Sequence, residues 1–365
     1  MQAILILTSC FISVCFGAEC VFNNNKKSYF CTGITDKFPN KYYGNYHLKC
    51  VGCNIPIFKP DTFPENGGLT SLNISESGIQ KIEPMAFSSL PTLSYLYLQN
   101  NIIQSVLPDA FFGLRELYEL HLEDNHLNQL QRHFLNGFES VTVYLNNNQL
   151  KEIPPRVFEG IFSVLALNLS HNNIGILHVD SFQYLSMLEV LDMNNNNLCY
   201  IPLGAFQHLL NLKDLDLSHN KLTAFSYGEL SGLRSVVSFN LGYNEFQEIG
   251  ESTIHAFASL TNLAHLDLSG ISGPLFLDTY SVVTYVPTLK SLTLNDNLWD
   301  CQTLAYTIQY LKTKNIDPFL KSPRHYDVSN INGIACSLAK VTEKLSFPKF
   351  LERAKWVVNK TTRYC

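Results

Sequence analysis

Apolar residues recur along most of this chain in one register, at intervals of about 24 positions. From Leu212 to Leu222, the sequence LKDLDLSHNKL carries leucine at its first, fourth, sixth and last positions and asparagine at its ninth. Further segments repeat this register: LSYLYLQNNII, LYELHLEDNHL, VLALNLSHNNI, LEVLDMNNNNL, VVSFNLGYNEF and LKSLTLNDNLW. A fixed period of this length is the signature of a protein built from stacked repeats.

The leucines of one repeat predict how the repeats pack. Leu212, Leu215 and Leu217 point inward from one short strand, and a single repeat cannot bury them, so neighbouring repeats stack into a continuous core. Asn220 stands where the chain leaves the strand, and its amide can bond backbone groups that the sheet leaves unpaired. The expected fold class is α/β: a β-rich solenoid, shaped as a horseshoe, with a parallel sheet on its concave face.

Phenylalanine recurs in the second half of the repeats, where we expect the rings to pack into a spine on the convex side. The residues of this spine are Phe87, Phe111, Phe158, Phe182, Phe206 and Phe257. The ninth full repeat departs from the pattern, because Ile271 stands where asparagine belongs. Gly270, Gly273 and Pro274 indicate a loop there. A tolerated insertion is the plain interpretation of this loop, and a binding loop is the alternative.

The first residues of the chain have the features of a signal peptide. Residues 1–17 hold no charged side chain and run apolar from Ile4 to Phe16, so we expect a mature chain that starts near Ala18. No later stretch reaches the roughly 20 apolar residues of a membrane span. The sequence ends without the hydrophobic tail of a lipid anchor. The expected location is therefore secreted and extracellular.

Ten cysteines, eight of them after the expected cleavage site, fit an oxidising compartment. Cys20 and Cys31 flank a polar turn, which predicts a disulfide-bonded hairpin over the open end of the core. His47, Cys50 and Cys53 lie in a degenerate first repeat and spell H-x-x-C-x-x-C. A zinc site would need a fourth ligand. Because none is evident, we favour disulfide chemistry and predict no metal.

After Cys301 the repeat pattern gives way to the spacing of a helix that lies across the last repeat. The apolar residues at this spacing are Leu304, Ile308 and Leu311. Cys336 is expected to bond Cys301, and a second helix is expected from Pro348, a favoured first helical residue, to about Val358. The sequence thus predicts a helical C-terminal cap.

These features divide the chain into four parts. The parts are the signal peptide (1–17), an N-terminal cysteine cap (18–44), a degenerate repeat plus ten repeats (45–300) and a C-terminal cysteine cap (301–365).

Cys199 and Cys365 have no obvious mate within the chain. We predict that Cys365 is free or bonds another chain in an oligomer, and a bond within the cap is the alternative.

Charge is spread unevenly between these parts. Residues 69–300 hold 9 Lys and Arg against 23 Asp and Glu, whereas residues 301–365 hold 11 against 4. Because the repeats would repel phosphates, we expect no nucleic-acid partner. The basic cap could meet an acidic partner or a sulfated glycan, and a merely solvated surface is the plainer explanation.

The sequence contains no motif for catalysis or cofactor binding. It contains no G-x-S-x-G elbow, no H-E-x-x-H and no glycine loop that could cradle a phosphate. Aspartate and histidine do meet on the expected concave face, but without an evident nucleophile. We therefore expect that the protein is not an enzyme and takes no cofactor.

The signal peptide, the two cysteine caps and the repeats with their phenylalanine spine resemble the extracellular leucine-rich repeat superfamily. Within it, the chain is similar to Toll-like receptor ectodomains and to short secreted insect leucine-rich immune proteins. The stretch NLWDCQTLAYTIQYLKTKNI resembles the cap of the mosquito group, although the usual C-x-C pair is reduced to Cys301. Long members of that group carry a coiled coil and pair through a disulfide, whereas this chain has no heptads.

The resemblance implies recognition of a protein or a pathogen-associated ligand, and innate immunity is the expected setting. The alternative is an extracellular adhesion or matrix protein, or a soluble regulator of a receptor. Fold alone does not choose between these functions.

The residue between the second and third leucine sites of each repeat projects from the concave sheet, because side chains alternate along a strand. This column reads Asn73, Tyr97, His121, Tyr144, Asn168, Asp192, Asp216, Asn240, Asp267 and Thr293, with Tyr95, Tyr118 and Asp214 beside it. We hypothesise that a partner with basic and apolar features docks on the tyrosines, on His121 and on the strip Asp192, Asp214 and Asp216. The alternative is that these are ordinary strand residues, since tyrosine favours strands.

Three glycosylation sequons begin at Asn73, Asn168 and Asn359. If the first two are used, glycans stand on either side of the Tyr97–Tyr144 part of the column. Glycans could instead close this face and leave the convex side or the caps for binding.

Overall fold

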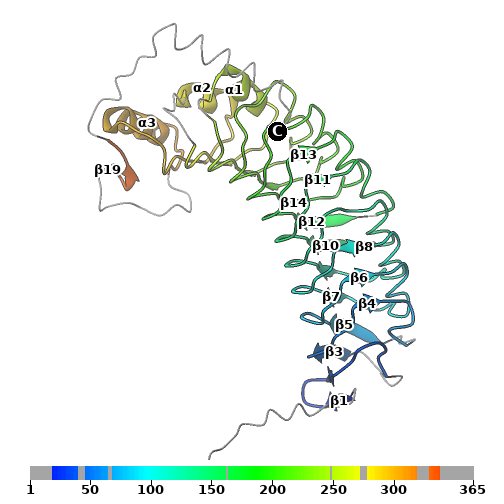
Figure 1. The fold of residues 1–365 in the computed structure, drawn as a ribbon. Helices are drawn as coiled ribbons and strands as arrows, with labels where there is room; N and C mark the ends of the chain where they lie inside the picture. Colours follow the sequence, from blue (N-terminus) through cyan, green and yellow to red (C-terminus); the bar gives the residue numbers. More distant parts are fainter. Residues whose placement is uncertain are drawn as a thin grey trace, which may run out of the picture.

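The computed structural model describes residues 19–39, 46–64, 68–161, 163–246, 249–271, 278–318 and 329–337. They form a curved solenoid (Figure 1). Its main sheet has 13 strands. In spatial order they are β1 (Glu19–Asn23), β2 (Ser28–Thr32), β3 (Tyr46–Val51), β5 (Leu69–Asn73), β7 (Tyr95–Tyr97), β9 (Glu119–His121), β10 (Val141–Tyr144), β12 (Val164–Asn168), β14 (Val190–Asp192), β15 (Asp214–Asp216), β16 (Ser238–Asn240), β17 (His265–Asp267) and β18 (Ser291–Thr293).

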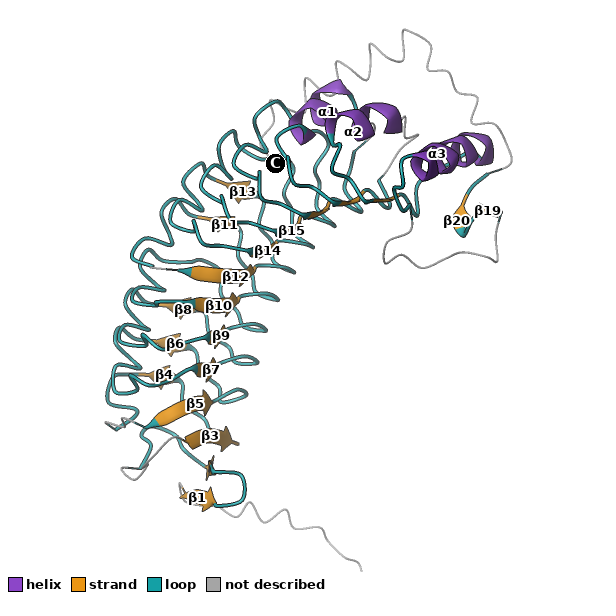
Figure 2. Cartoon of the chain, turned by 180° about the vertical axis from the view of Figure 1, so that it is seen from behind, coloured by secondary structure: helices purple, strands orange, loops and turns teal. Residues whose placement is uncertain are grey.

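The main sheet lines the inner side of the curve, and shorter strands lie on the outer side (Figure 2). The outer strands are β4 (Ile57–Phe58), β6 (Lys81–Ile82) and β8 (Ser105–Val106), followed by the pair β11 (Glu152–Ile153) and β13 (Ile176–Leu177). All pairs of the main sheet are parallel except β1–β2, which is an antiparallel hairpin. The predicted solenoid with a parallel concave sheet is therefore confirmed.

Leucines that repeat in the sequence are buried between neighbouring turns of the solenoid. Leu212 and Leu217 are fully buried, and Leu215 is 2% exposed. The parallel register sets Leu215 of β15 beside Leu191 of β14 and Phe239 of β16. Each strand therefore buries its apolar face against both neighbours, which a lone repeat could not do.

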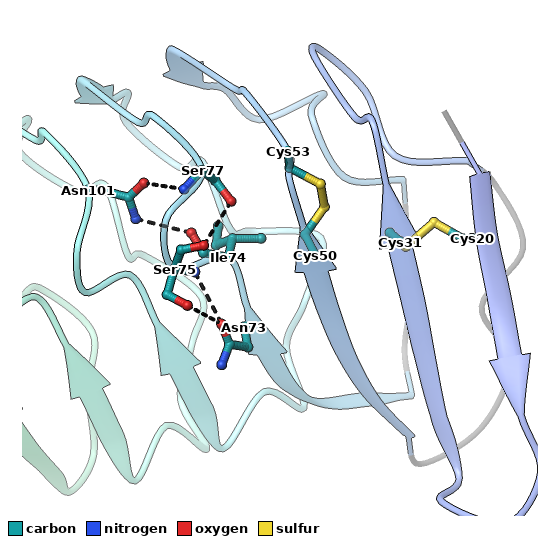
Figure 3. The surroundings of a disulfide bond; sticks show 9 residues. All are labelled: Cys20, Cys31, Cys50, Cys53, Asn73, Ile74, Ser75, Ser77 and Asn101. Atoms are coloured by element: carbon teal, nitrogen blue, oxygen red, sulfur yellow. Dashed lines mark hydrogen bonds between the residues drawn. A yellow bond between two sulfur atoms is a disulfide. The ribbon is translucent and has the colours of Figure 1, made fainter. Parts of the chain in front are cut away.

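A ladder of buried asparagines joins successive turns. Asn220 Nδ2 donates to the carbonyls of Met193 and Leu217, each at 3.0 Å, and its Oδ1 accepts the N–H of Leu198 at 3.0 Å. Figure 3 shows the same arrangement at Asn101, which bonds Ile74 and Ser77 of the preceding turn. Equivalent bonds form at Asn125, Asn148, Asn172, Asn196, Asn244 and Asn297. The predicted role of this asparagine is confirmed.

The phenylalanine spine forms over most of its predicted length. Phe87 stacks on Phe111 with ring centroids 5.6 Å apart, and Phe182 lies 6.1 Å from Phe206. Phe58 extends the spine toward the N-terminus. It is interrupted after Phe206, where the next repeat has Leu230 at this position. Phe257 packs instead against Phe225 of the interrupted repeat.

Both ends of the core are covered. A disulfide joins Cys20 of β1 to Cys31 of β2, and a second joins Cys50 to Cys53 in the degenerate repeat (Figure 3). At the other end, helix α3 (Cys301–Thr313) begins after Asp300, whose side chain accepts the N–H of Thr303. Its buried residues include the three predicted from the spacing, Leu304, Ile308 and Leu311. The cap also contains the hairpin of β19 (Asn330–Ile331) and β20 (Ile334–Ala335) and the disulfide Cys301–Cys336.

Two short helices were not expected from the sequence. They are α1 (Glu251–Phe257) and α2 (Thr279–Tyr285), and they lie side by side near the C-terminal end (Figure 1). Helix α2 follows the departure at Ile271, whose N–H donates to Asn297 Oδ1. The predicted loop residues Gly273 and Pro274 and the predicted helix from Pro348 to Val358 lie outside the described residues. No helix among the described residues has the length and apolar character needed to cross a membrane.

Cys199 is disulfide-bonded. The sequence offered no obvious mate for it, because spacing along a repeat does not reveal which distant segment lies beside it. Cys365 lies outside the described residues, so its expected free or intermolecular state stays a prediction.

We expect Asn220→Ala to lower the free energy of unfolding by about 1–3 kcal/mol, because buried backbone groups of two turns lose their partners. Lys221→Ala, at the exposed next position, is the control and should stay within about 0.5 kcal/mol of the wild type. Urea unfolding followed by circular dichroism measures both. Equal midpoints and slopes for the two variants would contradict the structural role of the ladder.

Candidate binding surface

The parallel register brings the predicted column together on the concave face. Pairing sets Asn73 beside Tyr97, Tyr97 beside His121, and His121 beside Tyr144. The column continues through Asn168, Asp192, Asp216, Asn240, Asp267 and Thr293. Thr293 pairs with Asp267 and lines the concave hollow as expected, but it is only 3% exposed. The accessible column ends at Asp267.

Three aromatic rings of this column form one stack. The His121 ring lies between Tyr97, at 4.7 Å between centroids, and Tyr144, at 4.5 Å, with the ring planes 24° and 14° apart. Tyr95 and Tyr118 meet edge to face beside the stack at 6.0 Å. Tyr118 is exposed, whereas the stacked rings are half-buried. The surface therefore offers broad ring faces that are already held in place, which suits a rigid contact area.

Two glutamates, which sequence analysis did not single out, hold His121. Glu123 Oε1 lies 2.9 Å from Nδ1, and Glu119 Oε2 lies 3.3 Å from Nε2. Alternation along the strand gave a signal for this arrangement, because Glu119, His121 and Glu123 are two residues apart and share one face. With a carboxylate at each ring nitrogen, both nitrogens can donate only in the charged imidazolium.

Burial lowers the pKa of His121, but the hydrogen bonds and charges of Glu123 and Glu119 outweigh it, so that the net pKa is raised. Burial raises the pKa of Tyr97 and of Tyr144, and the charge of Glu119 adds to both effects. The stack therefore consists of neutral phenols around a histidine biased toward its cationic form. Cation and ring faces attract each other in this arrangement.

Outside the stack, most column residues use one side-chain oxygen to shape the turn after the strand. Asp216 Oδ1 accepts the N–H of Ser218 at 2.8 Å and its hydroxyl at 2.6 Å. The same bond to the N–H two residues further on forms at Asn73, Asn168, Asp192, Asn240 and Asp267. These residues therefore have a structural function, which sequence analysis did not recognise, in addition to any binding role.

The acidic residues line a hollow of about 370 Å³ over β14 to β18. The predicted Asp192, Asp214 and Asp216 lie in it, together with Asp267 and His265. Asp214 is exposed, whereas burial raises the pKa of Asp192 and Asp267, and the charge of Asp216 adds to both shifts. Asp216 accepts a further bond from Asn240 at 2.9 Å. Several carboxylates in one hollow favour a cationic occupant.

The described residues contain no group of His, Cys, Asp and Glu that could hold a metal ion. One contact that the sequence did not reveal joins His265 Nδ1 to the hydroxyl of Ser291, at 2.9 Å on adjacent strands. Ser291 is buried, and no carboxylate among the described residues bonds the other nitrogen of His265. Among the described residues, this pair has no third group of the kind that orients the histidine beside an activated serine.

The first two sequons lie in the column on either side of the aromatic stack. Asn73 Oδ1 accepts the N–H and the hydroxyl of Ser75, and its nitrogen points away from them (Figure 3). Asn168 makes the same contacts with Ser170 and lies between Tyr144 and Asp192. A glycan on Asn168 would thus stand between the stack and the acidic hollow. Asn359 lies outside the described residues.

We expect the pKa of His121 to lie above the ordinary value of about 6.5, and Glu123→Gln to lower it. A raised folded-state pKa adds stability that is complete below about pH 6.5 and is lost as pH rises through the raised value. NMR titration of the imidazole and urea unfolding across this pH range measure both effects. Glu116→Gln, an exposed carboxylate outside the stack, is the control. A His121 pKa that does not change in Glu123→Gln would contradict this account.

The repeats match one family model, described as leucine rich repeat, over residues 67–127, 141–198 and 200–246. None of the curated proteins matches the chain. Among solved structures, the chain resembles the crystal structure of a TLR13–ssRNA13 complex at 26% identity and a TM-score of 0.59, over 71% of this chain and 42% of that one.

Two further solved structures show the fold. A chain of the Toll–Spatzle complex of Drosophila is 22% identical with a TM-score of 0.56, over 74% of this chain and 40% of that one. The leucine-rich repeat chain FLRT2, in an octameric complex with Latrophilin 3 and Unc5D, is 22% identical with a TM-score of 0.62, over 87% of this chain and 95% of that one.

The chain spans about two fifths of the TLR13 and Toll chains and nearly all of the FLRT2 chain. The matched repeats, the asparagine ladder and the common solenoid lead to one assignment. Residues 67–127, 141–198 and 200–246 are leucine-rich repeats, and the solenoid that they form resembles a Toll-like receptor ectodomain.

Proposed function

We propose that the protein is a secreted recognition protein of innate immunity that binds a protein or a pathogen-associated ligand on its concave face. The observation that carries the proposal is the stack of Tyr97, His121 and Tyr144, which continues along the same column into the acidic hollow. Rigid aromatic faces are favoured interface anchors. The expected partner combines apolar groups for the stack with basic groups for the hollow.

The relatives support a recognition role. TLR13 was solved with an RNA, and Toll with Spatzle. An RNA ligand fits this chain poorly, because its repeats hold 23 Asp and Glu against 9 Lys and Arg and would repel phosphates. We therefore favour a basic protein or peptide.

An extracellular location fits the chain in two ways. Its first 17 residues resemble a signal peptide, and disulfides are typical of oxidising compartments. Affinity purification from the native body fluid, followed by mass spectrometry, would identify the partner and test secretion in one experiment.

An adhesion or matrix protein, or a soluble regulator of a receptor, is the second candidate. It is favoured by FLRT2, which matches nearly the whole of both chains and was solved with Latrophilin 3 and Unc5D. Induction of the transcript by infection would favour immune recognition. Constitutive, tissue-restricted deposition would favour adhesion.

For the partner so identified, we expect Tyr97→Ala and Tyr144→Ala each to weaken binding by about 2 kcal/mol, or roughly thirtyfold in Kd. Asp214→Lys should also weaken it, and this exposed residue lies in the hollow outside the hydrogen-bonded turns. Tyr306→Ala, an exposed tyrosine of the C-terminal cap, is the control for loss of a surface ring. Calorimetry measures all four. Unchanged affinity in the three concave variants would exclude this face.

We expect glycans on Asn73 and Asn168, and an Asn168→Asp variant that loses one of them without loss of stability. Aspartate can still accept the turn hydrogen bond, as it does at the equivalent Asp192. Mass spectrometry before and after glycosidase treatment counts the glycans, and thermal melts check the fold. A mass that does not change on treatment would show that neither sequon is used.

A further inference from the structure

Two tyrosine rings from different helices lie against each other at the C-terminal end of the solenoid. The rings of Tyr280 on α2 and Tyr310 on α3 have their centroids 5.3 Å apart, and their planes are inclined by 30°. Helix α2 precedes β18, the last strand of the main sheet, and α3 begins the C-terminal cap after that strand (Figure 2). These two tyrosines, which we call the junction pair, therefore lie across the boundary between the last repeat and the cap.

The junction pair is open to solvent and lies outside the concave hollow. Tyr280 is 66% exposed, and Tyr310 is half-buried. Burial raises the pKa of the Tyr310 hydroxyl, and the neighbouring Tyr280 and Asp278 add to the shift. Tyr310 is thus a neutral phenol at physiological pH, so that removal of an electron from it is accompanied by loss of a proton. Neither ring lines the hollow, so a ligand on the concave face gives the pair no function.

We propose that the junction pair is a modification site, at which a haem peroxidase and hydrogen peroxide join Tyr280 to Tyr310 through a dityrosine bond. The proposal goes beyond ligand recognition, because it concerns a covalent change at the end of the solenoid that does not involve the ligand.

The reaction balances with hydrogen peroxide as the oxidant. Each phenol gives up one electron and one proton and becomes a phenoxyl radical. The two radicals form one carbon–carbon bond between ring positions next to the hydroxyl groups. The hydrogens at those two carbons then move to the oxygens and restore two phenols. Hydrogen peroxide accepts the two electrons and two protons and leaves as two water molecules, so the protein loses two hydrogen atoms.

The geometry of the junction pair favours coupling within the molecule. A second ring already in contact with a radical has a high effective concentration, and coupling to it outruns coupling to another molecule. Two other tyrosine pairs, Tyr29–Tyr46 and Tyr95–Tyr118, meet edge to face at 5.7 and 6.0 Å. In that arrangement the edge of one ring points at the face of the other, so the reactive edge carbons of both rings are not brought together. The junction pair is stacked, and its rings stand on two helices rather than on neighbouring strands.

A bond at this place would hold the cap to the repeats. The disulfide Cys301–Cys336 joins two parts of the cap to each other. The cap contacts the last strand through hydrogen bonds, among them the one from the Leu292 N–H to the carbonyl of Asp317 at 2.9 Å. Hydrogen bonds open reversibly, whereas a carbon–carbon bond does not, and it restricts the unfolded chain as a disulfide does. The cross-linked cap would therefore stay closed over the end of the leucine core.

Peptide mapping of the full-length protein, treated in dilute solution with a haem peroxidase and hydrogen peroxide, tests the site. We expect dityrosine fluorescence, a monomer on reducing gels and one linked peptide pair that contains Tyr280 and Tyr310. Tyr280→Phe keeps a ring in the stack but should lower the yield of this linked pair about tenfold or more, because the radical on Tyr310 loses its preplaced phenol. Tyr306→Phe is the matched control, since Tyr306 is 64% exposed on the same helix, and its yield should equal that of the wild type. A bond mapped to another pair, links only between molecules, or equal yields in Tyr280→Phe and wild type would each overturn the site.

Thermal melts of the same samples test the effect on the cap. Treated wild type should melt at a higher temperature than untreated wild type, whereas treatment should not raise the melting temperature of Tyr280→Phe, in which oxidation elsewhere still takes place. Melts of the untreated variants confirm that they fold. An equal change in wild type and Tyr280→Phe would overturn the stabilising function of the cross-link.

Discussion

The hydrogen bonds of the buried asparagines hold each turn of the solenoid to the turn before it. Each side chain satisfies carbonyl and N–H groups that neither the sheet nor a helix could pair, as Asn220 does for Met193 and Leu198. Unpaired groups at that depth would offset much of the stability gained from the leucines. The leucines provide the apolar core, but the asparagines fix the spacing at which the turns repeat.

That spacing makes the concave face an ordered array with one column residue for each turn. At six positions the column residue is Asn or Asp and accepts the backbone N–H two residues further on, as Asp216 does from Ser218. Tyr97, His121 and Tyr144 cannot make that bond through a carboxylate or amide oxygen, and their rings stack on one another instead. Because these three side chains do not form the hydrogen bond that shapes the turn, they are the strongest structural candidates for a binding role.

Electrostatics separates the concave face into two regions. In the stack, the carboxylates of Glu119 and Glu123 both bond to His121 and favour its cationic form. In the hollow, Asp192 and Asp267 are partly buried near Asp216, and a cation placed there would relieve the repulsion among these carboxylates. Asn168, which begins a sequon, stands between the two regions, so its glycan would decide whether one ligand can span both.

The sequence by itself determined the solenoid, the register of the column and the asparagine ladder, because a fixed period forces equivalent residues into equivalent places. It also indicated helix α3 and Leu304, Ile308 and Leu311 on its buried face. Only the tertiary structure decided that Glu119 and Glu123 hold His121, that Ser291 meets His265, and that Cys199 is disulfide-bonded. The contacts of His121 depend on how far side chains of one turn reach, whereas the contact between His265 and Ser291 joins two turns. A one-dimensional period specifies which residues share a face, but not which atoms on that face come within bonding distance.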